Sequence, residues 1–277
     1  MDADEHKGLS PTDSGTLDIA VLRNLAQDLR ARELSAQPGR PLSAAHPALT
    51  VADAYRVQLE YVKLRTSDGA KIVGHKVGCT NPLLQAQFGI DQPDYGHLLD
   101  DMVLSDGAQI SIGRLIAPRI EAEIAFVLGR TLEGPKVTAL DVLDATRAII
   151  PCFEIVDSRI EDWRITIADT VADNGSSSAV VLGHRTHPAG VTDLRSLGLV
   201  LEVNGRVAGT GAGAAVLGHP AESVAWLAKA IAPLGQQLKE GHVVLSGALS
   251  SSVKVNAGDV VYADFGVLGV VRCSFDS

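Results

Sequence analysis

The sequence is poor in aromatic residues and in paired cysteines. Aromatic residues make up 4% of its 277 positions, too few to indicate a platform on which bases or sugars stack. The three cysteines, Cys79, Cys152 and Cys273, lie far apart, so neither a CxxC motif nor a disulfide framework is indicated. Their odd number and apolar settings favour reduced thiols. Residues 1–16 contain no signal-peptide core, and we therefore expect a cytoplasmic protein.

Basic residues are also scarce. The chain has 24 Lys and Arg against 33 Asp and Glu, a formal net charge of −9. This balance disfavours nucleic acid and anionic membranes as partners. No apolar run reaches the roughly 18 residues that a transmembrane helix needs. An acidic small substrate would be repelled too, so its site would need a local positive centre, either a metal ion or a buried lysine.

Several common catalytic and nucleotide motifs are missing. The sequence contains no GxSxG elbow, no P-loop and no GxGxxG set between a strand and a helix. Gly209, Gly211 and Gly213 form a GTGAG stretch, but no acidic residue follows at the offset expected for a ribose contact. No cluster of histidines or thiolates indicates a zinc site. The chemistry must therefore come from other residues.

The pattern of the chain changes near residue 71. Residues 1–16 are polar and aperiodic, as expected of a disordered tail. Residues 17–70 form a helical region, in which helical spacing of apolar residues predicts two helices, over 17–34 and 51–65. Residues 71–277 are expected to form a catalytic domain of mixed β structure.

Short β segments dominate the second part of the chain. They are residues 71–78, 109–113, 119–129, 149–157, 177–183, 197–211, 242–247, 253–266 and 267–275. Asn204-Gly205 predicts a two-residue hairpin turn, and two helices are expected over 140–149 and 222–231. Because strands and helices do not alternate regularly, we expect an α+β fold built on a curled, barrel-like mixed sheet with N-terminal helices.

Two glutamates share one face of the predicted strand 119–129. Side chains alternate along a strand, so Glu121 and Glu123 point the same way, with Cα atoms roughly 6.5–7 Å apart. Carboxylates at this spacing can converge on one ion. A solvated strand face would produce the same pattern, but Ala125 and Val127 follow on this face and indicate that it is partly dry.

A third glutamate, Glu154, lies in the apolar run IIPCFEIVD. A buried charge must be paired, protonated or bound to a metal, because its transfer out of water is costly. Together with Glu121 and Glu123 it forms a set of oxygen ligands. Such a set suits a hard cation with open water positions, namely Mg²⁺ or Mn²⁺.

Lys76 and Asp94 are candidates for proton transfer. In the strand 71–78, Lys76 shares its face with Ile72 and Gly78, so it could be desolvated and catalytic. A surface lysine at a strand edge is the alternative. Asp94 lies in DQPDYG and could equally form a turn. The polar stretches DNGSSS and LSGALSSS are typical of loops when taken alone.

In combination, these motifs resemble the fumarylacetoacetate hydrolase superfamily, within it the branch of 2-keto-4-pentenoate hydratases and 4-oxalocrotonate decarboxylases. The similarity covers roughly residues 17–275. It is carried by GHKVGCTN, DQPDYGHLLDDM, RIEAEIAFVLG, CFEIVDSRI, DTVADNGSSSAVVLG, LSGAL and AGDVVYADFGVLG. Each piece alone is weak, but their order and spacing are specific.

The resemblance implies roles for particular residues. They are a metal site at Glu121, Glu123 and Glu154, a catalytic Lys76, an acid at Asp94, and substrate contacts at Ser176 and Ser246. Similar sequences often carry Ala where this chain has Gly175, which we expect to loosen the turn locally.

The implied activity is hydration of 2-hydroxypenta-2,4-dienoate to 4-hydroxy-2-oxopentanoate, as in meta-cleavage degradation of aromatic compounds or steroids. A cation would chelate the C1 carboxylate and C2 oxygen. Decarboxylation of 2-oxo-3-hexenedioate is the alternative, and would require a cationic group for the distal carboxylate. Arg119 and Arg159 are the spare cations in the matching segments.

A non-catalytic homologue, acting as a subunit or small-acid binder, is a further alternative. We also expect a homo-oligomer that could associate with neighbouring pathway enzymes.

Overall fold

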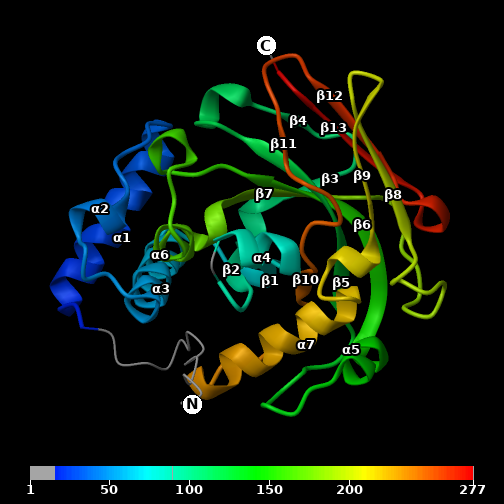
Figure 1. Ribbon diagram of the computed structural model, residues 1–277, viewed down its shortest axis with the longest axis horizontal. Helices are drawn as coiled ribbons and strands as arrows, with labels where there is room; N and C mark the ends of the chain where they lie inside the picture. Colours follow the sequence, from blue (N-terminus) through cyan, green and yellow to red (C-terminus); the bar gives the residue numbers. More distant parts are fainter. Residues whose placement is uncertain (1–15, 89, 277) are drawn as a thin grey trace, which may run out of the picture.

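The computed structural model describes residues 16–88 and 90–276 (Figure 1). The expected disordered tail, residues 1–16, lies outside the described residues except for Thr16. Helices gather beside and below two β-sheets, and most strands belong to the larger sheet. The described part of the chain is therefore a mixture of helix and sheet, as the sequence predicts.

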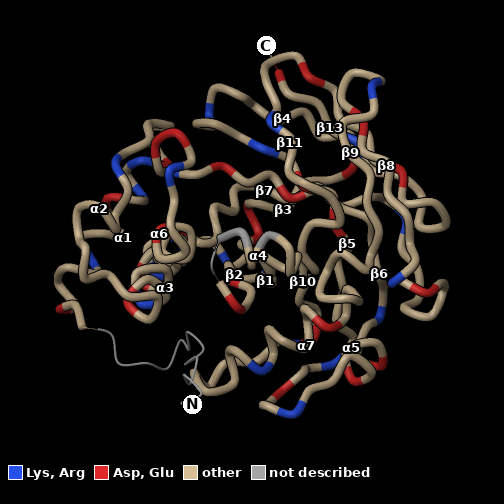
Figure 2. The backbone as a smooth tube through the Cα atoms, in the orientation of Figure 1, with Lys and Arg blue, Asp and Glu red and all other residues tan. Residues whose placement is uncertain are grey.

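Three helices precede the first strand. They are α1 (Ile19–Ser35), α2 (Leu42–Ala45) and α3 (Val51–Ser67). The helices predicted over 17–34 and 51–65 correspond to α1 and α3 to within two residues at each end. Helix α3 begins where expected because Thr50 and Asp53 form a reciprocal capping box. Arg65 of α3 reaches Glu33 of α1 at 2.5 Å, and Figure 2 shows basic and acidic positions interleaved on these helices.

The larger sheet has mixed strand directions. Its main path runs β2 (Asp94–Leu99), β1 (Ile72–Gly78), β10 (Val243–Leu245), β5 (Arg119–Leu128), β6 (Thr146–Val156), β7 (Ser177–Leu182) and β3 (Val103–Ser105), and β11 (Val253–Lys254) also pairs with β5. Strands β5 and β6 are the longest pair and run antiparallel. Their pairing places Glu121 directly opposite Glu154.

The second sheet contains five strands. Its order is β4 (Gln109–Ile110), β13 (Val270–Phe275), β12 (Val260–Asp264), β8 (Gly198–Val203) and β9 (Arg206–Ala212). Strands β8 and β9 form the predicted hairpin, in which Asn204 and Gly205 have φ of 52° and 72°. Positive φ at both turn residues is the geometry that an Asn-Gly pair favours.

Of the remaining helices, the one predicted over 222–231 is confirmed, and the others show where local pattern misleads. These remaining helices are α4 (Pro82–Phe88), α5 (Ala139–Ala145), α6 (Ile167–Ala172) and α7 (Pro220–Ile231). The predicted helix over 140–149 was too long, because residues from Thr146 onward pair with β5 as the start of β6. Burial between two neighbouring strands overrides the helical spacing of the same apolar residues. The strand β2 and the helices α4 and α6 were not predicted.

The fold belongs to the α+β class, with two sheets that remain open, so a barrel-like roll is only a loose description. The helices α1, α3 and α6 lie on one side of the larger sheet, next to its edge strand β2 (Figure 1). Within the described ranges, no helix combines the length and the apolar character that crossing a membrane requires.

Candidate metal centre and active site

Three glutamates converge at the middle of the larger sheet. Glu121 and Glu123 lie on one face of β5, and Glu154 lies on the adjacent strand β6. Each offers a carboxylate oxygen, and these oxygens all lie within 4.8 Å of one another. The period of two along β5 and the antiparallel register with β6 together produce this arrangement.

Several carboxylate oxygens of this triad lack hydrogen-bond partners. Glu123 and Glu154 are fully buried. Among the described residues, Oε1 of Glu123 and both carboxylate oxygens of Glu154 have no hydrogen bond of normal geometry. Burial of ionised oxygens without compensation is costly. A divalent cation fits this donor set, because it would supply the missing positive charge and coordinate the free oxygens.

The same crowding raises the pKa of the three carboxyl groups. Burial is the main cause for each, and repulsion from Glu154 adds to it for Glu121 and Glu123. The pKa of Glu121 is raised to about 7, and that of Glu123 well above its usual value. Without a cation, the triad therefore retains protons that a bound metal would displace.

Lys76 points from β1 into the same space. Its Nζ lies 3.6 Å from Oε1 of Glu154, although β1 and β6 are separated in the sheet by β10 and β5. The two side chains therefore meet across two intervening strands. Burial alone would lower the pKa of Lys76, but Glu154 and Asp94 outweigh it and raise the pKa. Lys76 therefore stays an ammonium ion and a hydrogen-bond donor.

Asp94 begins β2 and approaches Lys76 over Gly78. The register pairs Gly78 with Asp94, and a methyl group at Gly78 would collide with Oδ1 of Asp94 and lie 3.3 Å from Lys76 Nζ. Asp94 is buried, and its Oδ1 has no hydrogen-bond partner among the described residues. Burial raises the pKa of Asp94, against the opposing effect of Lys76. The site thus holds a carboxyl group and an ammonium group side by side.

The loop before β7 packs against β2 and Lys76. Asp173 forms a buried ion pair with Arg159 at 2.6 Å, and Asn174 exchanges hydrogen bonds with the backbone of His97 on β2. The hydroxyl of Ser176 donates to Asp173 at 3.1 Å, so it faces this ion pair. The next residue, Ser177, has a buried hydroxyl that helps to lower the pKa of Glu154.

Ser177 was missed by sequence reasoning. The run of serines was noted as a polar loop. The point at which strand β7 begins, which decides the direction of each hydroxyl, could not be predicted from that run. The substrate contact assigned to Ser176 remains a prediction. Ser177 is the serine whose hydroxyl lowers the pKa of Glu154.

Gly175 lies against the stem of Lys76. It has φ of +61°, and a Cβ there would collide with Cε of Lys76 and come within 2.8 Å of Nζ. We had expected the glycine only to loosen the turn, but its missing side chain also affects Lys76. It provides the space in which the lysine extends toward Glu154.

The loop after β10 fixes Glu123. The backbone N–H of Gly247 donates to Oε2 of Glu123 at 2.7 Å. The Ser246 hydroxyl donates to the carbonyl of Gly247 at 3.3 Å and is fully buried. Gly247 has φ of +103°, and a Cβ would collide with the side chain of Thr80, so glycine is required at this turn. The structure thus places Ser246 beside a contact to the triad.

The two spare arginines have different surroundings. Arg159 is buried and occupied, since it pairs with Asp173 and donates to the carbonyls of Asp157 and Ser177. Arg119 is partly exposed, shares the Glu121 face of β5, and stacks over Trp163 at 4.6 Å. Arg159 is therefore excluded as a partner for a second substrate carboxylate.

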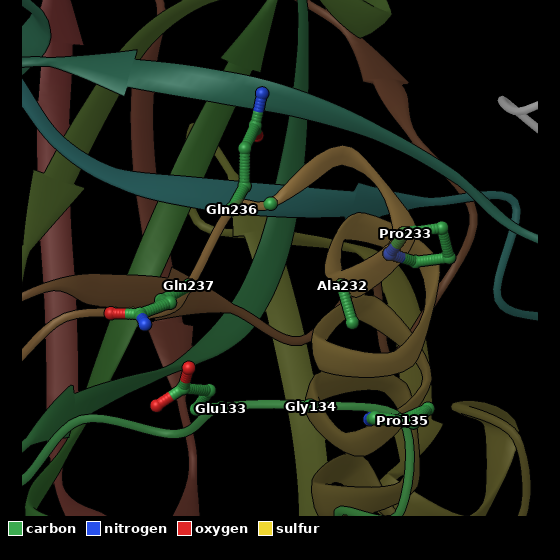
Figure 3. Close-up of a pocket in the computed structure, with 8 residues that line it drawn as sticks. Glu133, Gly134, Pro135, Ala232, Pro233, Gln236 and Gln237 are labelled. Atoms are coloured by element: carbon green, nitrogen blue, oxygen red, sulfur yellow. The ribbon is translucent and has the colours of Figure 1, made fainter.

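A surface pocket lies away from this chemistry. Its volume is about 260 Å³, and it lies between a loop at Glu133–Pro135 and the segment 232–237 after α7 (Figure 3). Its lining includes a single carboxylate, Glu133, and none of the residues that meet at the triad. The buried triad is therefore the better candidate for the active site.

The fold and the acidic centre define a known family. The description "Fumarylacetoacetate (FAA) hydrolase C-terminal" matches residues 71–276, and the chain belongs to this family.

The relatives are enzymes of unsaturated 2-oxo acids. The chain is 46% identical to a 2-hydroxyhexa-2,4-dienoate hydratase of Comamonas testosteroni, covering 87% of this chain and 91% of the relative. It is 43% identical to a 2-keto-4-pentenoate hydratase of Paraburkholderia xenovorans, covering 91% and 94%. A solved 4-oxalocrotonate decarboxylase from Pseudomonas putida G7, complexed with magnesium and adipate, superposes with a TM-score of 0.92 at 38% identity, covering 95% and 100%.

Proposed function

We propose that the protein is a hydro-lyase that adds water to 2-hydroxypenta-2,4-dienoate or a close homologue, giving a 4-hydroxy-2-oxo acid. The observation that carries the proposal is the buried triad of Glu121, Glu123 and Glu154, with unsatisfied oxygens beside the ammonium group of Lys76. The hydratases at 41–46% identity over most of the chain support the choice of reaction.

The triad would hold Mg²⁺ or Mn²⁺. When bound, such a cation supplies a Lewis acid that attracts the C1 carboxylate and the C2 oxygen of the substrate. Gly247 keeps Glu123 oriented by its N–H donor, and Lys76 balances part of the charge of Glu154. These residues thus bind and orient the acid end, which the net negative charge of the chain would otherwise repel.

Lys76 and Asp94 are the residues placed to move protons. Ketonisation of the dienol requires proton delivery at C5, and hydration requires a water oriented toward C4. The ammonium group of Lys76 can donate a proton, and the free Oδ1 of Asp94 can accept one or orient water. Both groups lie next to Gly78. If the triad holds the acid end of the substrate, C4 and C5 would lie near Lys76 and Asp94.

The second candidate is decarboxylation of 2-oxo-3-hexenedioate, favoured by the close superposition on the decarboxylase. It requires a cation for the distal carboxylate. Arg159 is already paired with Asp173, so of the two arginines only Arg119 could bind the distal carboxylate. Hydration needs no such group and is therefore preferred.

The test is direct comparison of the two substrates. With Mg²⁺ present, the purified protein should consume the monocarboxylic dienoate, followed by its ultraviolet absorbance, without releasing CO₂. Rapid CO₂ release from 2-oxo-3-hexenedioate with little hydration would assign the decarboxylase instead. Absence of metal-dependent turnover with both compounds would favour a non-catalytic small-acid binder.

Localisation and assembly are further proposals. A cytoplasmic location fits three free cysteines, two of them buried, and a family of small-acid enzymes. We also propose that the chain forms a homo-oligomer and could associate with neighbouring pathway enzymes. Size-exclusion chromatography with light scattering tests the first of these associations.

A further inference from the structure

The second sheet has one packed face and one exposed face. Along β12, Val261 and Ala263 are buried, whereas Val260 and Tyr262 on the other side of the strand are exposed. Burial alternates in the same way along β13 and most of β8. Figure 1 shows these strands on the opposite side of the molecule from the N-terminal helices. We call the exposed side the β12 face. It carries Val200 and Glu202 of β8, Val207 of β9, Val260 and Tyr262 of β12, and Arg272 of β13.

Apolar side chains on the β12 face remain in contact with water. The exposed fraction is 63% for Val207 and 54% for Val260, and it is 38% for Val200 and 37% for Tyr262. An antiparallel sheet with one solvated face normally presents polar side chains on that face. An exposed apolar patch with polar neighbours is instead typical of a protein–protein interaction site. The β12 face therefore has the character of a surface that another protein covers.

A row of three side chains crosses the middle of this face. Tyr262 pairs with Glu202 on one neighbouring strand and with Arg272 on the other. The row therefore reads anion, aromatic ring, cation, with about 4.8 Å between strands. Within the described part of the chain, neither charged side chain takes part in an ion pair or a hydrogen bond. Each of the two is thus free to meet a charge on a partner.

Such a row is complementary to itself. A copy turned by 180° about an axis that runs along β12 keeps Tyr262 at the centre and exchanges the two sides of the row. Arg272 then faces Glu202 of the partner subunit, and Glu202 faces Arg272 of the partner subunit. Rotation about an axis across the strands would instead place like charges opposite each other, so the charges select one arrangement.

The geometry of packed sheets agrees with this arrangement. Two sheets that pack face to face lie about 10 Å apart, with strand directions within about 30° of each other. A long arginine and a glutamate that extend from opposite sheets can meet across such a gap. The exposed valines around the row would lose their contact with water at the same time, which favours association.

We propose that two copies of this chain associate through the β12 face, about a two-fold axis that runs along β12. The inference rests on the homo-oligomer proposed above and names its surface. It does not depend on the reaction, because the glutamate triad lies on the larger sheet.

The test reverses the two charges one at a time and then together. Sedimentation equilibrium of the full chain over a range of concentrations measures association. Arg272→Glu or Glu202→Arg alone would place like charges opposite each other twice in each dimer, and should raise the Kd at least about hundredfold. In the double variant the reversed charges again meet their opposites, so the Kd should return to within about tenfold of the wild-type value.

The double variant also controls for the fold, since it has the amino-acid composition of the wild type. Lys229→Glu on α7 and Glu240→Arg before β10 provide further controls, because they change the net charge equally at exposed positions on other elements. Both should associate like the wild type. Thermal unfolding of each single variant should give the wild-type Tm at a concentration where all the proteins are monomers.

The outcomes separate this inference from the proposals on which it rests. A wild type that stays monomeric at all concentrations would overturn both the homo-oligomer and the β12 face. An oligomer that neither single variant weakens would overturn the β12 face alone. Weakening in the single variants without recovery in the double variant would show that the two charges do not face each other. Loss of hydratase activity in the wild type would leave the interface unaffected.

Discussion

Glu123 has the most confined carboxylate of the triad. One oxygen accepts the Gly247 N–H at 2.7 Å, and the other has no hydrogen bond among the described residues. Glu121, by contrast, is only half-buried and lies toward the solvent side of the site. A ligand or ion therefore has one rigid glutamate at its inner side and a more accessible one at its outer side.

We predict that Glu121→Gln, Glu123→Gln and Glu154→Gln each weaken Mg²⁺ binding by about tenfold or more, because each removes a charged oxygen ligand. Calorimetry measures the affinity. Thermal unfolding provides a second measurement, since a bound cation raises Tm and the variants should lose that rise. Glu133→Gln, in the distant surface pocket, is the control. Unchanged affinity in all three triad variants would refute a metal site here.

Lys76 can be tested apart from the metal. Its ammonium group contacts Glu154 but supplies no ligand atom, so Lys76→Met should remove most turnover while Mg²⁺ binding persists. Lys254→Met, at an exposed position on β11, controls for the loss of a positive charge. A near-normal kcat in Lys76→Met would return this lysine to a structural role.

At the scale of elements, the pairing of β1 with β2 brings Lys76 and Asp94 together. The absence of a side chain at Gly78 leaves room for Asp94 and Lys76 to face the same space. We predict that Gly78→Ala lowers kcat at least about tenfold, because displacement of a catalytic group by about 1 Å has large effects on rate. Mg²⁺ affinity should not change, since the triad lies on β5 and β6.

Gly113→Ala is the matched control for this prediction, because a methyl group there meets no other atom within 4 Å. Loss of Mg²⁺ binding in Gly78→Ala would mean that the fold itself is disturbed. Unchanged kinetics would mean that Asp94 and Lys76 do not act through the space above this glycine.

The elements also show what a sequence can and cannot predict. Alternation along β5 predicted that Glu121 and Glu123 share a face, because that period is fixed by strand geometry. The contact between Lys76 and Glu154 was not predictable in this way, since it depends on the order of strands that are distant in the sequence. The role of Gly247 depends likewise on a partner, Glu123, that lies 124 positions away.

At the scale of the whole molecule, three histidines lie together on the sheet. The ring of His75 lies at a tilt to those of His97 and His242, with ring centroids 4.9 Å and 5.8 Å away. Strand parity puts His75 on the opposite face of β1 from Lys76. Burial lowers the pKa of all three, that of His97 to about 4, and the charge of a neighbouring imidazole would lower those of His75 and His97 further.

These depressed pKa values make the fold sensitive to acid. The folded protein keeps the imidazoles neutral, whereas an unfolded chain takes up protons once the pH falls below the ordinary histidine pKa of about 6.5. Unfolding therefore binds protons, and stability is lost as the pH falls from about 6.5 toward 4. Each histidine contributes up to about 1.4 kcal/mol per pH unit. The raised pKa values of the metal-site carboxyl groups act in the opposite direction.

A matched variant separates the two effects. We predict that the stability of the wild type relative to His97→Gln, measured by urea unfolding with saturating Mg²⁺, decreases as the pH is lowered from 7.5 to 5. The carboxyl groups are the same in both proteins, so their contribution cancels in this difference. Gln can still hydrogen-bond with Gln58, the present partner of His97 Nδ1 at 3.0 Å. A difference that stays constant across this range would mean that His97 gains its proton in the folded and unfolded chains alike.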